Sequence, residues 1–519
     1  MRSHTVIVGA GIGGLASAAL LAARGHAVTV IEKEAVPGGK AGTLNVDGAP
    51  IDSGPTVFTL RDVFDSLFRE CGADLDEAVA ARPADLLARH AWSDSERLDL
   101  FANPARSEEA IGDFAGARAA AGYRAFRAEA ARIFAILDRP MLRGSKMGWP
   151  GPLMWRIGLW RLGALGAIRP YESLWNALGG HFDNVRLRQM FARYATYCGS
   201  SPFQSPATLM LVAHVEATGV WLIDGGIAAL AAAIQRLAES HGARFRFGQP
   251  VRGIDIANGR ASGVTLASGE RIEADAVIVN ADPAALAAGR FGEAVRRAVR
   301  PMPPRRRSLS AYVWTAHALA RGFPLARHNV FFSPDYPAEF RDIAAGRPPS
   351  DPSVYVCALD RDNSGRDSRD GPERLQIIVN APADGDVHHH SSDERDLCTK
   401  AMRRTLDRCG LTLSDPFPHL LRTPNEFEAF SPSTGGAIYG PASHGWAASF
   451  RRQGARTRIP GLYCAGGSTH PGAGVPMAAL SGRLVADAVT RDRASARSFH
   501  PAATAGGMSM RSATTESTA

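Results

Sequence analysis

The first thirty residues of the chain predict a strand, a helix and a second strand, separated by short glycine-containing turns. Residues 6–8 are Val-Ile-Val, a β-branched run without a polar interruption, which predicts a buried parallel strand. Residues 15–23 are rich in alanine and leucine, which favours a helix, and Gly25 ends it. Residues 27–31 repeat the strand pattern. This order predicts a βαβ unit.

The turn after the first strand has the sequence Gly-Ala-Gly-Ile-Gly-Gly. In a GxGxxG turn of this kind, Gly9 permits the tight bend, Gly11 lets the backbone approach a pyrophosphate, and Gly14 lets helix and strand pack closely. Glu32, after the second strand, is expected to bind an adenosine ribose and to disfavour the 2′-phosphate of NADP. We therefore predict a dinucleotide site that includes Gly9, Gly11, Gly13, Gly14 and Glu32, with the phosphates at the helix N-terminus.

A second glycine-rich junction lies near the other end of the chain. Residues 462–465 predict a short strand, residues 466–476 are rich in glycine, and residues 477–488 predict a helix with Pro476 close to its first turn. Two such junctions so far apart predict a nucleotide domain that is assembled from both ends of the chain, with insertions between them.

The middle of the chain adds strand patterns at 244–251 and 276–280 and a hairpin at 263–272. Between these, the composition alternates between alanine- and arginine-rich helical stretches and mixed strands and loops. We predict an α/β fold with a Rossmann-like domain from residues 1–60, 215–290 and 441–490, a helical substrate- or membrane-facing region at 61–214, an α+β substrate domain at 291–440, and a disordered tail at 491–519.

Two stretches resemble a known family. Residues 6–39 resemble the FAD-binding opening of the amine oxidase and carotenoid desaturase superfamily, in which a glycine pair such as Gly38-Gly39 leads the chain under the flavin. A plain loop is the alternative for that pair. Residues 469–474, Thr-His-Pro-Gly-Ala-Gly, resemble the signature of phytoene-desaturase-type carotenoid enzymes, although the usual Gly-Ala-Gly before it is Gly-Gly-Ser here.

The resemblance implies tightly bound FAD. Besides the first turn and Glu32, it implies contacts to the cofactor from Lys40, Gly54, Thr56, the backbone of Val251, Gly466, Gly467, Pro476 and Met477. It also implies that the last helix points its N-terminus at the flavin. Such a helix dipole stabilises the negative charge that develops on the flavin during reduction by about 0.3–2 kcal/mol. This changes the reduction potential of the flavin only modestly.

Blocks at 193–203, 434–450 and 476–483 resemble the 1-hydroxycarotenoid 3,4-desaturase branch of that family. The resemblance implies that a C-3,4 double bond is introduced into an acyclic hydroxylated carotenoid, with a hydride passing to FAD, a proton to a weak base, and the electrons finally to oxygen or a quinone. Asp224, Glu216 and His470 are candidate bases, which the sequence does not rank. His470 is alternatively a residue that shapes its turn.

Three other functions stay open. One is a phytoene desaturase. The second is a non-catalytic prenyl-chain carrier related to the GDP-dissociation inhibitors, which share the GxGxxG opening; the second glycine-rich junction argues against it. The third is a flavin oxidase of amines or porphyrinogens.

Charge and aromatic content point to a membrane surface. The chain has 59 Lys and Arg against 51 Asp and Glu, but no long basic block, so we expect no nucleic-acid partner. Residues 141–170 combine tryptophans and large aliphatic residues with five basic residues and no acid, which predicts an interfacial helix. A core helix with snorkelling arginines is the alternative. With no apolar run long enough to span a bilayer, we expect a cytoplasmic protein attached peripherally to the membrane.

Cysteine and histidine spacing predicts no metal site. The six cysteines have no CxxC spacing, which favours reduced thiols over disulfides or a zinc site. Residues 387–390 are Val-His-His-His. Because adjacent histidines on regular structure cannot all face one ion, we predict a solvated loop there.

Overall fold

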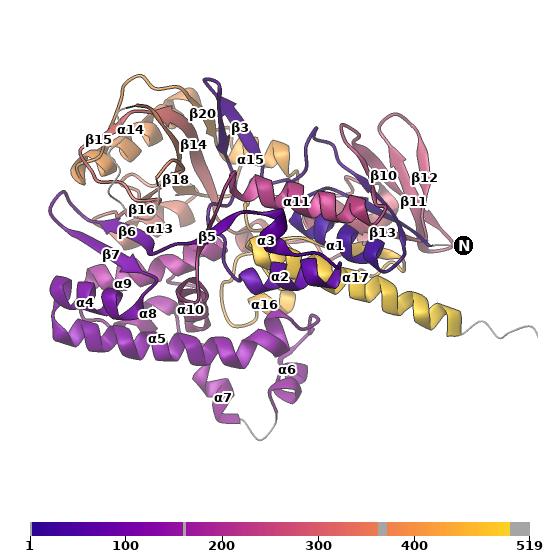
Figure 1. Cartoon of the computed structure of the whole chain (residues 1–519), viewed down its shortest axis with the longest axis horizontal. Coiled ribbons are helices and arrows are strands. Elements are labelled where there is room, and N and C mark those ends of the chain that lie inside the picture. Colours follow the sequence, from indigo (N-terminus) through magenta and orange to yellow (C-terminus); the bar gives the residue numbers. More distant parts are fainter. Residues whose placement is uncertain (1–2, 159–161, 362–370, 499–519) are drawn as a thin grey trace, which may run out of the picture.

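Five parallel strands from distant parts of the chain form the sheet beneath the first glycine-rich turn. The structure, a computed structural model, describes residues 3–158, 162–361 and 371–498. The strand order of this sheet is β21-β13-β1-β2-β9, and all of its pairings are parallel. Its strand β13 is labelled on the right in Figure 1. Its strands are β1 (His4–Val8), β2 (Ala27–Ile31), β9 (Arg244–Arg246), β13 (Ala276–Val279) and β21 (Leu462–Cys464). The predicted βαβ unit and the distant strands that join it are confirmed.

The first and the last helix of the described chain pack closely against each other. Ser17 in α1 (Ile12–Ala23) donates a hydrogen bond to the carbonyl oxygen of Gly482 in α17 (Val475–Ser498) at 3.1 Å. A Cβ atom at Gly482 would lie 2.4 Å from the carbonyl oxygen of Gly13. Only glycine therefore permits this approach of the two helices. The helix α11 (Gly226–Ser240) packs against α1 as well.

The last helix is longer than the sequence pattern predicted. The pattern placed its end at residue 488 and a disordered tail from residue 491, but α17 continues to Ser498. No glycine or proline interrupts residues 489–498, so nothing in this stretch stops the helix. The rest of the predicted tail, residues 499–519, lies outside the described residues.

A three-stranded antiparallel sheet stands beside the parallel sheet. It consists of β10 (Val251–Ala257), β11 (Arg260–Leu266) and β12 (Arg271–Glu273). Val264 pairs with Ile272 across the predicted hairpin, which is thereby confirmed. β10 begins at Val251.

A seven-stranded sheet forms the other half of the molecule, with the order β20-β14-β18-β17-β16-β6-β7. Its strands are β6 (Leu86–Ala91), β7 (Arg97–Phe101), β14 (Ser310–Ala318), β16 (His328–Phe331), β17 (Val354–Ala358), β18 (Glu373–Ala381) and β20 (His419–Arg422). β6 and β7 come from the stretch predicted to be helical. Leu98 and Leu100 are buried while Arg97 is exposed, a local alternation that the overall composition of that stretch conceals.

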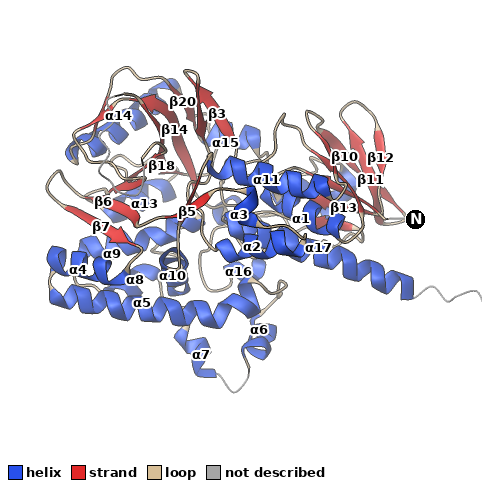
Figure 2. Cartoon of the chain, in the orientation of Figure 1, coloured by secondary structure: helices blue, strands red, loops and turns tan. Residues whose placement is uncertain are grey.

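Helices from the same stretch form a layer along the seven-stranded sheet, on the lower side of the view in Figure 2. They are α4 (Pro104–Ala115), α5 (Ala117–Leu137), α6 (Pro150–Ile157), α7 (Leu162–Ala167), α8 (Leu174–Gly179), α9 (Val185–Ala192) and α10 (Leu211–Ala217), with the short helical turns η1 (Asp138–Leu142), η3 (Arg193–Cys198) and η4 (Ala207–Met210).

The predicted interfacial helix at 141–170 is not one helix. The π-helical turn η1 is followed by α6 and α7, and residues 159–161 between them lie outside the described residues. Pro150 starts α6, and Gly158 ends it with a φ of 100°. Among the helices that the structure describes, none is both long and apolar enough to cross a bilayer.

Shorter elements connect these layers. They are the strands β3 (Thr43–Val46), β4 (Ala49–Asp52), β5 (Ala81–Pro83), β8 (Trp221–Ile223), β15 (Ala320–Arg321) and β19 (Thr412–Leu413), and the helices α2 (Arg61–Glu70), α3 (Leu75–Ala78), α12 (Pro283–Ala287), η5 (Glu293–Ala298), η6 (Pro304–Arg306), α13 (Tyr336–Ala344), α14 (Ser392–Arg408), α15 (Pro424–Phe430) and α16 (Ala448–Arg451).

Candidate active site

A cavity of about 1300 Å³ joins the two halves of the molecule. It begins at the first glycine-rich turn, passes the second one, and continues along the inner face of the seven-stranded sheet to the segment that contains α6. All the predicted cofactor residues except Gly14 line it. A Cβ atom at Gly14 would lie 2.2 Å from the carbonyl oxygen of Gly9, so this glycine serves the packing of helix against strand.

The first glycine-rich turn presents the bare N-terminus of α1 to the cavity. Gly11 is the N-cap of α1 and supplies no side-chain cap, so the first N–H groups of the helix face the cavity. Gly9 has a φ of 103°, which favours glycine. The N–H of Gly38 donates to the carbonyl oxygen of Ala10 at 2.8 Å, which holds the predicted glycine pair against the turn.

Glu32 is buried at the end of β2 and lines the same part of the cavity. One carboxylate oxygen accepts a hydrogen bond from the N–H of Ala10 at 2.6 Å, and the other accepts one from the N–H of Glu34 at 2.9 Å. Each oxygen keeps a further lone pair for a ligand. The carboxylate is therefore held in place at the cavity, as an acid that binds a ribose requires.

Asn280 lies between the two glycine-rich junctions and was not singled out from the sequence. A Cβ atom at Gly11 would lie 2.6 Å from its Nδ2 atom, and one at Gly466 would lie 2.9 Å from its Oδ1 atom. Among the residues described, that buried Oδ1 atom has no hydrogen-bond partner. The sequence signal was its place directly after a buried strand, where the carboxyl ends of parallel strands bind ligands.

The segment around Lys40 and Thr56 connects the part of the molecule that holds the two glycine-rich junctions to the seven-stranded sheet. The ammonium group of Lys40 donates to the carbonyl oxygen of Ile438 at 2.8 Å. The amide of Gln376 in β18 donates to the carbonyl oxygen of Gly54 at 3.0 Å. The hydroxyl of Thr56 lies 2.7 Å from that of Tyr355 in β17.

The second junction starts α17 at the cavity. Gly466, Gly467, Pro476 and Met477 line the cavity, and the first turn of α17 contains no acid. Arg452, which the sequence did not single out, donates to the carbonyl oxygen of Gly467 at 3.2 Å and fixes this turn. Two helix N-termini, an orphaned amide oxygen and a buried ribose-type acid together fit FAD.

The three candidate bases lie in different surroundings. Glu216 is buried and lines the cavity, and the hydroxyl groups of Tyr194 and Tyr197 donate to its carboxylate. The guanidinium group of Arg193 lies 3.6 Å from it. Of the three candidates, Glu216 alone therefore lies where a substrate could reach it.

His470 and Asp224 lie elsewhere. His470 is buried, and its Nε2 atom is 2.8 Å from the carbonyl oxygen of Gly144, so it joins its turn to the segment before α6. Burial lowers its pKa. Asp224 is exposed and does not line the cavity. The structure supports the turn-shaping role for His470 and gives no support to a base at Asp224.

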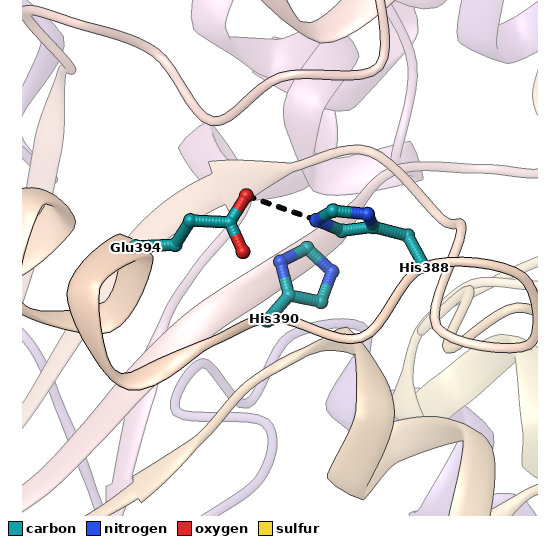
Figure 3. A group of neighbouring side chains, drawn as sticks. All are labelled: His388, His390 and Glu394. Atoms are coloured by element: carbon teal, nitrogen blue, oxygen red, sulfur yellow. Dashed lines mark hydrogen bonds and ion pairs between the residues drawn. The ribbon is translucent and has the colours of Figure 1, made fainter.

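The histidines at 388–390 are not a fully solvated loop. Figure 3 shows His388, His390 and Glu394 turned toward one another, and their ligand atoms lie within 4.8 Å. His390 is buried, and its two ring nitrogens lie 2.8 Å from the hydroxyl of Tyr312 and 3.0 Å from Asp384. Glu394 caps the start of α14 and also contacts His388 at 2.9 Å. Helix capping and buried hydrogen bonds thus account for this cluster.

Two family models match parts of the chain: an NAD(P)-binding Rossmann-like domain at residues 7–71 and a flavin containing amine oxidoreductase at residues 165–326. A structure of putrescine oxidase bound to putrescine superimposes with a TM-score of 0.56 at 17% identity, over 95% of this chain and 99% of that one. The fold is therefore the Rossmann-like, FAD-binding fold of the amine oxidase type.

Similarity to named desaturases identifies the family within this fold class. Hydroxyneurosporene desaturase of Rubrivivax gelatinosus is 50% identical over 99% of this chain and 98% of its own length. The zeta-carotene-forming phytoene desaturase of Myxococcus xanthus is 30% identical over 93% of each chain. The chain belongs to the carotenoid desaturase family, as its motifs predicted, and is an FAD-dependent oxidoreductase. This membership also excludes the prenyl-chain carrier.

Proposed function

We propose that this protein introduces a C-3,4 double bond into an acyclic 1-hydroxycarotenoid such as 1-hydroxyneurosporene. The observation that carries the proposal is the 50% identity, along the whole chain, to a hydroxyneurosporene desaturase, against 30% to a phytoene desaturase. The cavity agrees with it, because a long apolar chamber that passes the FAD-binding turns is what a polyene requires.

The reaction removes two hydrogens from adjacent carbons. One hydrogen leaves as a hydride with the electrons of its C–H bond. The hydrogen on the neighbouring carbon leaves as a proton, and the electrons of that second C–H bond form the new double bond. FAD supplies the hydride acceptor. The cavity side chains hold the polyene in one register and exclude water. The Glu216 carboxylate is our candidate for the base that accepts this proton, because it is buried and lines the cavity.

The closest alternative is desaturation of phytoene. The two functions are separated by incubating purified, FAD-loaded protein with 1-hydroxyneurosporene or with phytoene, each with oxygen or a quinone as electron acceptor. We expect a longer polyene, with red-shifted absorption, from the hydroxylated substrate and little turnover of phytoene. Turnover of phytoene alone would reassign the protein to the phytoene desaturases and leave its fold and cofactor unchanged.

Attachment to a membrane surface is the second part of the proposal. Trp149 and Trp155 are 65% and 74% exposed, next to Arg156 and a cavity wall that includes Met154. Aromatic and basic side chains at a cavity wall suit the bilayer interface, where a C40 substrate dissolves. The core-helix alternative holds for one side of this segment, because Leu153 is buried.

A further inference from the structure

Side chains on the inner face of the seven-stranded sheet form rows across the cavity. Gln376, Ile378 and Asn380 alternate along β18, so all three point to the cavity that they line. Ile378 pairs with Tyr355 of β17 and with Val313 of β14. At about 3.4 Å per residue, Asn380 lies roughly 7 Å beyond the row of Tyr355 and Ile378.

The near rows belong to the cofactor end of the cavity. Gln376 donates to the carbonyl oxygen of Gly54, and the hydroxyl of Tyr355 meets that of Thr56. Substrate carbons that react with FAD are therefore expected beside the row of Tyr355 and Ile378. The row of Asn380 is the next one beyond them.

The far row has a polar group at its centre. Glu339 of α13 is 1% exposed and lines the cavity. One oxygen of its carboxylate accepts from the N–H of Ser353 at 3.1 Å, and the other accepts from the amide of Asn380 at 3.4 Å. Burial raises the pKa of Glu339 to about 7, more than these hydrogen bonds lower it. The carboxylate is thus fixed but keeps lone pairs toward the cavity.

Two further donors, on residues that line the same cavity as Glu339, lack partners. The hydroxyl of Tyr336, one helical turn earlier, is buried at the cavity and has no hydrogen-bond partner among the described residues. The Nε atom of Arg193 is likewise buried and unpartnered within the described ranges. Burial raises the pKa of the Tyr336 hydroxyl; the charge of Glu339 raises this pKa further, and that of Arg193 lowers it. Val330 and Phe332 make the neighbouring wall apolar. Because buried polar groups normally have hydrogen-bond partners, these unpartnered donors indicate a polar ligand.

We propose that Glu339 and Tyr336, assisted by Arg193, bind the terminal hydroxyl of the carotenoid. The inference rests on the proposed function and names the part of the site that selects the substrate. The hydroxyl oxygen is three single bonds from C3, at most roughly 4 Å away. A hydrogen bond to it adds about 2.8 Å. Together these lengths match the roughly 7 Å between the two rows.

The hydroxyl then exchanges hydrogen bonds with both residues. It donates to the free lone pair of the Glu339 carboxylate and accepts from the Tyr336 hydroxyl, whose own proton is otherwise unused. A polyene without the hydroxyl leaves these buried groups unpaired, and a site of this kind rejects such an analogue strongly.

The test compares Tyr336→Phe and Glu339→Gln with the unaltered holoenzyme. The substrates are 1-hydroxyneurosporene and neurosporene, which lacks the hydroxyl. We expect the preference in kcat/KM for the hydroxylated substrate to fall by about 10- to 100-fold in each variant. The flavin content should not change. The melting temperature of Tyr336→Phe should not fall, because the lost hydroxyl has no partner within the protein.

Tyr312→Phe is the matched control. It removes another buried tyrosine hydroxyl, from β14 of the seven-stranded sheet, which bonds to His390 and does not line the cavity. It should lower the melting temperature and leave the preference between substrates unchanged.

Two results would overturn the proposal. If both variants keep the preference of the unaltered enzyme, the hydroxyl is bound elsewhere. If Glu339→Gln slows the reaction of both substrates equally, the Glu339 carboxylate is the base that accepts the substrate proton and does not bind the substrate hydroxyl. Both results differ from failure of the proposed function, in which the unaltered enzyme itself does not desaturate 1-hydroxyneurosporene.

Discussion

The cofactor end of the cavity is built mainly from backbone, whereas its far end is built from side chains. At the cofactor end, Gly9, Gly11 and Gly466 line the cavity, and their lack of a side chain leaves room for a ligand against the backbone. At the far end, Glu339 and Tyr336 come from α13, which a hydrogen bond from Asn380 to Glu339 connects to β18 of the sheet. A backbone site can be encoded in one short motif, but a side-chain site needs residues that only the complete fold brings together.

Gly11→Val is expected to damage the cofactor end alone, and to have the largest effect. Gly11 has an ordinary φ of −74°, so a larger residue causes no backbone strain there. Its Cβ would meet Asn280 at 2.6 Å and fill the space for the phosphates. We expect a folded, colourless and inactive protein. Flavin absorbance and circular dichroism measure the two properties separately.

The control for this prediction is Gly259→Ala. Gly259 has a φ of 74° and nothing within 4 Å of a Cβ atom, so this change introduces strain without a clash. It should keep its flavin. A full flavin complement in Gly11→Val would mean that the phosphates bind elsewhere.

The membrane segment provides a second test, with a smaller effect. Replacing Trp149 and Trp155 by serine should move most of the protein from anionic vesicles to the supernatant in co-sedimentation, without loss of flavin. Added salt should weaken binding of the unaltered protein, since charges are screened within about 10 Å at 0.1 M. Leu397→Ser removes an exposed apolar side chain from α14 and should have no effect on binding. Equal sedimentation of all variants would contradict this membrane surface.

The smallest expected effect concerns stability at the far end. Because the folded-state pKa of Glu339 is about 7 and its ordinary value is 4.5, the unfolded chain loses this proton first as pH rises. The resulting penalty to stability is absent at low pH, grows between these values, and reaches roughly 3 kcal/mol above pH 7. Glu339→Gln removes it.

Urea unfolding at pH 5 and pH 8 measures this difference. The stability of Glu339→Gln, relative to the unaltered protein, should be greater at pH 8 than at pH 5. Glu109→Gln, the same change at an exposed glutamate, is the control. If the two variants respond alike to pH, the Glu339 carboxyl is not buried as described.

The difference between the two ends also explains what the sequence could predict. The βαβ unit, the hairpin and the second junction follow from local patterns of glycine and apolar residues, and these were confirmed. Lys40 and Thr56 were found by resemblance. Asn280 was overlooked, because one asparagine after a strand is a weak signal.

The far end had no local signal at all. Tyr336 and Glu339 share a face of one helix, but Asn380 is 41 residues from Glu339 and reaches it only through the seven-stranded sheet. The strands β6 and β7 were missed because their short local alternation is concealed by the composition of the stretch around them. β7 pairs only with β6, and β6 joins the rest of the sheet through β16, more than two hundred residues away, a pairing that leaves no pattern in neighbouring residues.

The close contact between α1 and α17 has a consequence for synthesis of the protein. During translation the first strand and helix leave the ribosome early, but the edge strand β21 and α17, the partner of α1, are made only after residue 460. The apolar face of α1 that packs against α17 therefore stays exposed while the intervening chain folds. A chain that stops before residue 462 would lose an edge strand and this helix together. Its two insertions could fold, but its FAD site would remain open on one side.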